Sequence, residues 1–269
     1  MTADLSTHAE LMRVAHALAD AARPATLAYF RASELEAEDK GVIAFDPVTI
    51  ADRNAEQAMR AVLAAERPKD AILGEEFGYH VGTSGLTWVL DPIDGTRGYI
   101  SGTPTWGVLI SVADESGPLF GIIDQPYIGE RFAGGFGVAE VTGPMGHARL
   151  QCRTNRRLAD ATIMTTFPEV GDALEGRAFH AVAGQAKLTR YGMDCYAYAL
   201  VAAGQVDLVI EAGLNAYDIQ APIAVITAAG GIVTDWNGGP AHEGGRVLAA
   251  ANRDIHAEAL AILQSIANG

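Results

Sequence analysis

Cysteine is scarce in this sequence, and the two that occur form no paired motif. Cys152 and Cys195 make no C-x-x-C pair, so we expect free thiols in a reducing compartment rather than a disulfide framework. The seven histidines are scattered and form no H-E-x-x-H motif, which argues against a zinc site of that type. No G-x-G-x-x-G or G-x-x-x-x-G-K motif follows a predicted strand, so nothing predicts a nucleotide cofactor.

Basic residues and long apolar runs are also lacking. There are 19 Lys and Arg residues against 33 Asp and Glu residues, and the net charge of −14 argues against binding to nucleic acid or to an anionic membrane. No apolar run reaches the roughly 18 residues of a membrane span. Residues 1–10 are polar and lack the basic and apolar regions of a signal peptide, so we expect a cytoplasmic protein.

What remains is the composition of an ordinary globular protein, with 49% hydrophobic and 19% charged residues. Apolar residues at helical spacing predict a helix over 5–32, with a bend or break near Pro24. A second helix is predicted over about 49–66. The acidic stretch between the two helices, together with the Lys-Gly pair that follows it, predicts an exposed loop over 34–41.

The rest of the first half is rich in short runs of Val and Ile. These predict strands of an antiparallel sheet, with a turn at 117–118. The strands cover 71–76, the segment ending at Leu90, 106–113, 119–124 and 131–136.

Strands and helices alternate in the second half, which predicts an α/β arrangement there. The strands cover 161–165, 187–191, 206–211, 231–236 and 246–250, and the helices cover 172–185, 194–204, 217–230 and 255–266. We therefore expect one α/β unit with two lobes, an α+β lobe over about 1–148 and an α/β lobe over about 149–269, which share a cleft.

The stretch from Trp88 to Thr96 joins an apolar run to two carboxylates, a proline and a glycine. Asp91 and Asp94 are expected to follow the strand that ends at Leu90 and to lie on a turn. Two nearby carboxylates repel each other unless a cation or proton lies between them, so this spacing suggests a hard divalent metal. A plain surface turn remains an equal alternative, because Asp, Pro and Gly are common turn residues.

Other acids follow strands or begin helices, and each has an ordinary explanation by itself. Asp52 falls in the first turn of a predicted helix, where a carboxylate complements the helix dipole. Glu75 and Glu76 follow the strand that begins at 71, and paired Glu residues are usually solvated.

Taken together, four motifs resemble the inositol-monophosphatase superfamily of metal-dependent phosphatases. They are Asp-Pro-Val-Thr-x-Ala-Asp (46–52), Gly-Glu-Glu (74–76), Trp-Val-Leu-Asp-Pro-Ile-Asp-Gly-Thr (88–96), and Tyr-Asp-x-x-Ala-Pro (217–222) followed by Ala-Gly-Gly (229–231). The resemblance implies a five-layered αβαβα sandwich of the inositol monophosphatase and fructose-1,6-bisphosphatase type, with the active site between the lobes. A homodimer is usual for the family.

The same resemblance implies a role for each matching residue. Two or three Mg²⁺ ions, with Mn²⁺ as a substitute, would be held by Glu75, Asp91, Asp94, Asp218 and the main-chain carbonyl of Ile93, and Asp91 would bridge two metals. Asp52 and Thr96 would orient or deprotonate the attacking water, with Glu75 near a third metal. The amides of Gly95 and Thr96 would cradle the phosphate.

The flanking segments most resemble histidinol-phosphate phosphatases of the inositol-monophosphatase type, which act in histidine biosynthesis. These segments are 94–107, 192–198, 206–212 and 232–236. The leaving group of histidinol phosphate carries an ammonium and an imidazole, so Glu211 and Asp194 are candidates to pair with them. Asp194 could instead be the N-cap of a helix. Arg97 could contact the substrate or form a structural pair.

Two other functions remain open at this point. One is a phosphatase of the same fold that acts on inositol 1-phosphate or on a broad range of sugar phosphates. The other is a non-catalytic metal-binding regulatory protein, against which the complete set of acids argues. In either case we expect a small phosphate monoester as the ligand, with no nucleic-acid or membrane partner.

Overall fold

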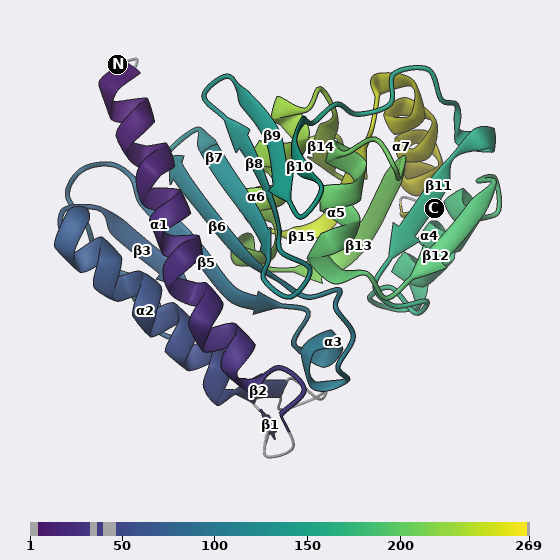
Figure 1. The fold of residues 1–269 in the computed structure, drawn as a ribbon. Coiled ribbons are helices and arrows are strands. Elements are labelled where there is room, and N and C mark those ends of the chain that lie inside the picture. Colours follow the sequence, from purple (N-terminus) through teal and green to yellow (C-terminus); the bar gives the residue numbers. More distant parts are fainter. Residues whose placement is uncertain (1–4, 33–36, 40–46, 268–269) are drawn as a thin grey trace.

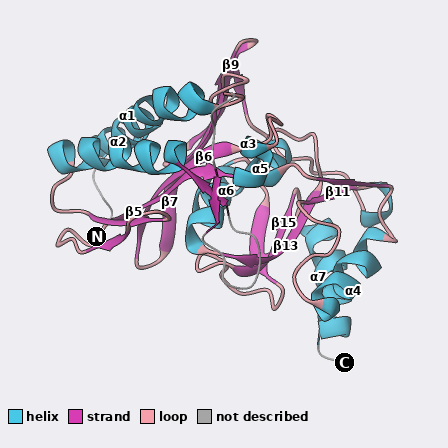
Figure 2. Ribbon diagram, turned by 90° about the horizontal axis from the view of Figure 1, so that it is seen from below, coloured by secondary structure: helices cyan, strands magenta, loops and turns pink. Residues whose placement is uncertain are grey.

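The computed structural model describes residues 5–32, 37–39 and 47–267, and their helices and sheets stack in five layers (Figure 1). The layers are a helix pair, an eight-stranded sheet, a second helix pair, a five-stranded sheet and a third helix pair, as Figure 2 shows from below. This arrangement confirms the predicted α/β class and the αβαβα sandwich.

The first layer consists of α1 (Leu5–Tyr29) and α2 (Ile50–Glu66). α1 continues through Pro24, so a break at that residue is wrong, and the helix ends at Tyr29 rather than at 32. Leu11 and Leu18 lie two turns apart on one face of α1 and belong to the core between the helices and the eight-stranded sheet.

The face of α2 that meets the sheet is defined by a repeat of four residues. Ala55, Met59 and Leu63 are buried there.

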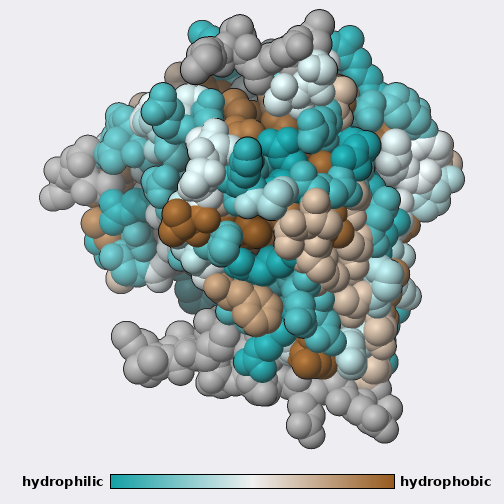
Figure 3. Space-filling view, turned by 90° about the vertical axis from the view of Figure 1, so that its left-hand side faces the viewer, coloured by the Kyte–Doolittle hydropathy of each residue, from teal (hydrophilic) through white to brown (hydrophobic). Residues whose placement is uncertain are grey.

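Figure 3 shows the molecule from the left-hand side of Figure 1, where hydrophilic side chains predominate and hydrophobic ones are scattered. None of the described helices is long and apolar enough to cross a membrane.

Between these helices, β1 (Ala37–Asp39) pairs antiparallel with β2 (Pro47–Thr49), the strand that leads into α2. The predicted loop over 34–41 is therefore wrong for 37–39, because main-chain pairing with β2 holds these residues extended. The other residues of that loop lie outside the described part of the chain, as does Asp46.

The eight-stranded sheet has the order β10-β9-β8-β7-β6-β5-β3-β4 and is antiparallel except where β3 runs parallel to β5. Its strands are β3 (Ala71–Gly74), β4 (Gly78–His80), β5 (Thr87–Asp94), β6 (Gly107–Asp114), β7 (Gly117–Gln125), β8 (Glu130–Gly135), β9 (Val138–Gly143) and β10 (Gly146–Arg149).

The turn predicted at 117–118 is wrong by two residues. Gly117 and Pro118 are the first residues of β7, and the turn lies at 115–116. The Asp114 carboxylate accepts hydrogen bonds from the backbone N–H and the hydroxyl of Ser116, at 2.8 and 2.6 Å, and these bonds close the turn before the glycine.

The central layer consists of α5 (Asp194–Ala202) and α6 (Ala216–Ala228). α6 contacts β5, β6, β7 and β8 on one side and β14 on the other. A Cβ atom on Gly121 or Gly134 would lie 2.6 or 2.5 Å from backbone atoms of α6. The two glycines thus allow α6 to approach the sheet closely, which brings Asp218 in its first turn to the end of β5.

The five-stranded sheet has the order β12-β11-β13-β15-β14. β11 runs parallel to β12 and β13, whereas β15 is antiparallel to β13 and β14. Its elements are β11 (Thr162–Thr165), β12 (Leu188–Tyr191), β13 (Leu208–Leu214), β14 (Ile232–Asp235) and β15 (Gly245–Ala250), with α4 (Ala173–Ala183) and α7 (Arg253–Ala267) in the fifth layer. The predicted alternation of strands and helices is confirmed, and the division into two lobes near 148 stays a prediction.

Candidate active site

A β-bulge near the end of β5 brings two carboxylates to the same side of the strand. Between Asp91 and Asp94 the register advances three residues on β5 but two on β6. Side chains of a regular strand alternate, so residues three apart would face opposite sides, and the extra residue reverses this. The predicted turn after Leu90 is therefore wrong, because β5 continues to Asp94 and the bulge at 92–93 aims the acids instead.

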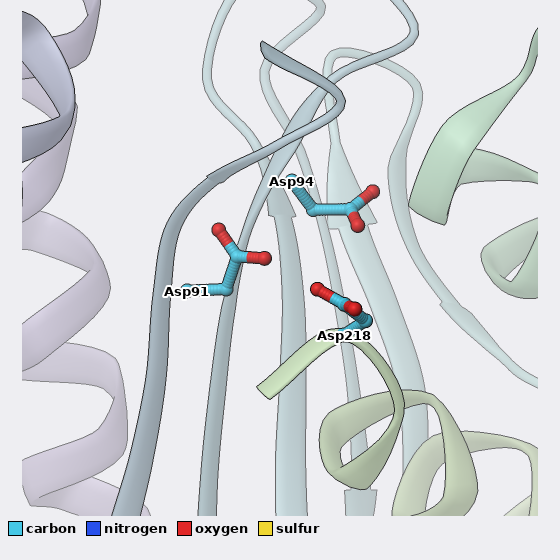
Figure 4. A group of neighbouring side chains, drawn as sticks. All are labelled: Asp91, Asp94 and Asp218. Atoms are coloured by element: carbon cyan, nitrogen blue, oxygen red, sulfur yellow. The ribbon is translucent and has the colours of Figure 1, made fainter. Parts of the chain in front are cut away.

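Asp218 reaches the same place from the start of α6. Asn215 is the N-cap, and its backbone N–H donates to the Asp218 carboxylate at 2.7 Å in a capping box. The ligand oxygens of Asp91, Asp94 and Asp218 all lie within 4.8 Å of one another. Figure 4 shows the three carboxylates pointing into one shared space.

This group, the acidic triad, is electrostatically strained without a cation. Burial, followed by the negative charges of Glu75 and Asp94, raises the pKa of Asp91. Burial, followed by the charge of Asp218, raises the pKa of Asp94. Asp91 is only 2% exposed, so the surface-turn alternative does not hold for it. Three clustered carboxylates with oxygen donors suit a hard divalent cation, and the residues present therefore fit the predicted metal.

Glu75 lies beside Asp91 because β3 and β5 are parallel and end at the same edge of the sheet. The backbone N–H of Glu75 donates to the Leu90 carbonyl at 3.2 Å. A hydrogen bond between the Glu75 and Asp91 side chains also raises the pKa of Asp91. The structure thus brings Glu75 to the acidic triad, although it is not one of the three residues within 4.8 Å.

Glu56 holds the turn at 75–77 in place, although no sequence motif includes Glu56. Its buried carboxylate accepts hydrogen bonds from the backbone N–H groups of Glu76 and Phe77, at 2.7 and 3.2 Å. Arg60 balances the charge at 2.7 Å. The signal in the sequence is an acid one helical turn after Asp52, on the face of α2 that also carries its buried apolar residues.

Asp52 both caps a helix and reaches the site. Its Oδ2 accepts hydrogen bonds from the backbone N–H and hydroxyl of Thr49, at 2.8 and 2.6 Å, which forms the capping box of α2. Its Oδ1 lies 3.5 Å from the Thr96 hydroxyl, which is also 3.1 Å from the Ile93 carbonyl oxygen. Burial raises the pKa of Asp52 to about 6.

The short helix α3 (Thr96–Ile100) begins after Gly95, which has a φ of 84°. A Cβ atom at Gly95 would lie 2.6 Å from the carboxyl carbon of Asp194, so this position needs glycine for both reasons. Asp194 itself has a φ of 46° and accepts a hydrogen bond from the Thr105 hydroxyl at 2.9 Å. The N-cap alternative for Asp194 is wrong, because Met193 occupies that position and makes no side-chain cap.

Glu211 is the central residue of β13 and is 6% exposed. Its carboxylate accepts hydrogen bonds from the Thr166 backbone N–H at 2.7 Å and from the Thr165 hydroxyl at 3.0 Å. Burial outweighs these bonds and raises the pKa of Glu211 to about 7, with a smaller contribution from the charge of Asp194.

Arg97 is exposed at the rim of the site, on α3. Its guanidinium lies 4.9 Å from the centroid of the Phe167 ring, in a cation–π arrangement. Its charge also opposes the rise that burial causes in the pKa of Asp194. Both alternatives for Arg97, substrate contact and structural pairing, remain open.

One cleft of about 250 Å³ joins most of these side chains. Its lining includes Asp94, Gly95, Thr96, Arg97, Asp194, Glu211 and Asp218, with Thr166, Phe167, Cys195, Tyr198 and 212–214 beside them. The remaining predicted residues, Asp52, Glu75, Asp91 and Ile93, reach it through the contacts described above. A larger hollow of about 740 Å³ is lined by the other end of α6 and by none of the predicted site residues.

Known proteins resemble this chain in sequence over nearly its whole length. Residues 7–268 match the model of the inositol monophosphatase family. The chain is 39% identical to the chloroplast bifunctional phosphatase IMPL2 of Arabidopsis thaliana, over 93% of this chain and 74% of that protein. It is 37% identical to the histidinol-phosphatase of Streptomyces coelicolor, over 94% of this chain and 96% of that protein.

Among solved structures, an inositol monophosphatase from Zymomonas mobilis superposes with a TM-score of 0.83 at 36% identity, covering 97% of this chain and all of that one. The family is metal-dependent, and the acidic triad supplies a place for a metal. The chain belongs to the inositol monophosphatase family and is a phosphatase that acts on small phosphate monoesters.

Proposed function

We propose that the protein hydrolyses L-histidinol phosphate to L-histidinol and phosphate with bound Mg²⁺. The observation that carries this proposal is the pair of acids Glu211 and Asp194, which line the same cleft as Asp94 and Asp218 but lie outside the acidic triad. Carboxylates also accept hydrogen bonds from the hydroxyls of a sugar alcohol, but only a cationic leaving group, with its ammonium and imidazolium, would compensate the charge of both acids. The likeness to the Streptomyces histidinol-phosphatase supports the same substrate.

The metal would be held by Glu75, Asp91, Asp94, Asp218 and the carbonyl of Ile93. Bound Mg²⁺ would supply a coordinated water of lowered pKa and positive charge against the phosphoryl oxygens. The protein fixes the orientation of two of these acids through backbone N–H groups. The Ile93 N–H donates to Asp91 at 3.0 Å, and the Cys195 N–H donates to Asp94 at 2.6 Å.

Thr96 and Asp52 would receive the proton of the attacking water. The water oxygen forms the new bond to phosphorus, and the ester oxygen leaves with the electron pair of the broken P–O bond. That oxygen takes up a proton from a solvent water, and Asp52 afterwards releases the proton that it received to solvent. The Thr96 hydroxyl passes the proton of the water to Asp52 Oδ1, which lies 3.5 Å away and has a pKa of about 6. The amides of Gly95 and Thr96 would bind the phosphate oxygens at the start of α3.

The leaving group would lie towards β13 and the start of α5. There Glu211 would pair with the ammonium and Asp194 with the imidazole. Both carboxylates are already held by threonine donors, so ligand binding does not have to order them. The cytoplasmic location that the sequence predicts and the homodimer that the resemblance implies are expected here as well. Size-exclusion chromatography with light scattering checks the homodimer.

A panel of four substrates tests the proposal. Histidinol phosphate, inositol 1-phosphate, fructose 1,6-bisphosphate and adenosine 3′,5′-bisphosphate are compared at equal Mg²⁺ concentration. We expect kcat/KM for histidinol phosphate to exceed the others by at least about 10-fold, since a buried charge pair contributes 1.4 kcal/mol or more. A higher value for inositol 1-phosphate would favour the alternative substrate, and no Mg²⁺-dependent release from any substrate would favour the regulatory protein.

A further inference from the structure

The hydroxyl of Tyr198 is buried beside the cleft and has no hydrogen-bond partner. Tyr198 lies on α5, one turn after Asp194, and is 4% exposed. Among the described residues, three buried side-chain atoms have no partner: Trp106 Nε1, Tyr198 Oη and Asp207 Oδ1. Of these residues, Tyr198 alone lines the cleft that holds Asp94, Asp218 and Glu211.

Two other tyrosines of this protein have hydrogen-bond partners for their hydroxyls. The hydroxyl of Tyr99, which is fully buried, donates to the Thr26 carbonyl at 2.6 Å. The hydroxyl of Tyr196, two residues before Tyr198 on the same helix, donates to Glu130 at 2.5 Å. An unpaired phenol hydroxyl in a protein interior costs free energy, so its place at a binding cleft indicates a partner that arrives with the ligand.

The surroundings of the hydroxyl define the chemistry of that partner. Burial and then the charges of Glu211, Asp94 and Asp218 raise the pKa of Tyr198, so its oxygen stays protonated and keeps its lone pairs at neutral pH. Glu211 and two of the predicted metal ligands, Asp94 and Asp218, line the same cleft as Tyr198. A cationic N–H donor held in this cleft by Glu211 would meet the hydroxyl as a neutral acceptor.

We propose that Tyr198 Oη accepts a hydrogen bond from the ammonium of the bound ester and thereby selects phosphate esters of 2-amino alcohols. This inference rests on the proposed function, because histidinol phosphate carries its ammonium on the carbon next to the ester CH₂ group. Glu211 supplies the negative charge that pairs with this ammonium, and Tyr198 supplies a neutral hydrogen-bond acceptor at a fixed position.

Tyr198→Phe tests the role, because it removes the hydroxyl and keeps the ring in the core. Steady-state kinetics are measured with histidinol phosphate and with glycerol 2-phosphate, which has no N–H group, and the unfolding temperature is measured on the Mg²⁺-loaded protein. We expect KM for histidinol phosphate to rise about 10- to 100-fold with kcat nearly unchanged. Glycerol 2-phosphate kinetics should stay within about twofold, and the unfolding temperature should be equal or higher.

Tyr196→Phe is the matched control on the same helix. It should leave the kinetics of both substrates within about twofold and lower the unfolding temperature, because it leaves Glu130 without its donor. If Tyr198→Phe left KM for histidinol phosphate unchanged, or lowered kcat/KM equally for both substrates, the inference about Tyr198 would be overturned while the proposed function would stand. A wild-type protein with no preference for histidinol phosphate over glycerol 2-phosphate would overturn the proposed function and this inference with it.

Discussion

On one wall of the cleft, the carboxylates of Asp91, Asp94 and Asp218 lie close to one another and to Glu75, whereas on the other wall Glu211 and Asp194 accept hydrogen bonds from threonines. The first wall is held in place by backbone N–H groups. The second wall is satisfied at 2.7 to 3.0 Å by Thr105, Thr165 and Thr166.

This difference separates the reaction from the choice of substrate. Clustered carboxylates raise one another's pKa, so the first wall is complete only with a cation and serves any phosphate ester in the same way. The second wall is already built in the free protein and, under the proposed function, would act on the leaving alcohol alone. Changes in the first wall should therefore affect all substrates, and changes in the second should affect substrates selectively.

The largest effect is expected from Asp91→Asn, which breaks the first wall. We expect kcat to fall at least about 1,000-fold with every substrate, because metal coordination contributes several kcal/mol to the transition state. With a chelator present, the variant should unfold at the same or a higher temperature than the wild type, because the amide relieves the repulsion with Glu75 and Asp94.

Asp160→Asn is the control for the loss of one negative charge, since Asp160 is exposed and far from β5 in the sequence. Its activity should equal that of the wild type. If Asp91→Asn kept more than a tenth of the wild-type activity, Asp91 would not bridge the metals.

Glu211→Gln breaks the second wall, and its effect should be smaller and selective. We expect KM for histidinol phosphate to rise about 10- to 100-fold, because an ionised hydrogen bond to the ammonium is lost. The apparent affinity for Mg²⁺, titrated through activity, should stay unchanged, because Glu211 is outside the acidic triad. Glu258→Gln, which removes an acid from a partly exposed ion pair with Arg157, is the matched control. Unaltered kinetics in Glu211→Gln would remove Glu211 from the binding of the leaving group.

The first wall and the fold could be predicted from the sequence because their signals are local or repeated. Helical and strand periods predict the helices and strands, the resemblance to the family implies their layers, and Asp91 and Asp94 stand in one continuous motif that ends an apolar run. The bulge in β5 could not be predicted in the same way. The bulge depends on the register of β5 with β6, a strand more than ten residues away in the sequence. The sequence alone therefore predicts a turn after Leu90, where β5 continues.

The second wall was only partly predictable, because its residues meet through tertiary packing. Asp194 could not be distinguished from an N-cap without its φ of 46° and its contact with Thr105. Glu56 and Tyr198 carry no motif, since a buried acid and a buried aromatic on helices look like ordinary core positions until their partners are known. The catalytic and binding roles of all these residues stay predictions.

The smallest expected effect is a pH dependence of stability that belongs to the second wall. In the folded protein the pKa of Glu211 is raised from 4.5 to about 7, while Tyr198 and Asp194 are the titratable groups that face it. A raised pKa means that the folded state holds the proton more tightly than the unfolded state does. The stability that this proton contributes is fully present below about pH 4.5 and is lost as the pH rises through 7.

Glutamine at position 211 is neutral at every pH, so Glu211→Gln removes this loss. The unfolding temperature of the variant minus that of the wild type should therefore increase between pH 5 and pH 8, by a few degrees. The rise in the pKa of Glu211 from 4.5 to about 7 corresponds to a change of roughly 3 kcal/mol at most in the free energy of unfolding. Thermal unfolding of both proteins across this range, with a chelator present, measures the difference and cancels the titration of the acidic triad. A difference that is flat with pH would mean that Glu211 is ionised throughout, and that the second wall holds its charge before any cationic ligand binds.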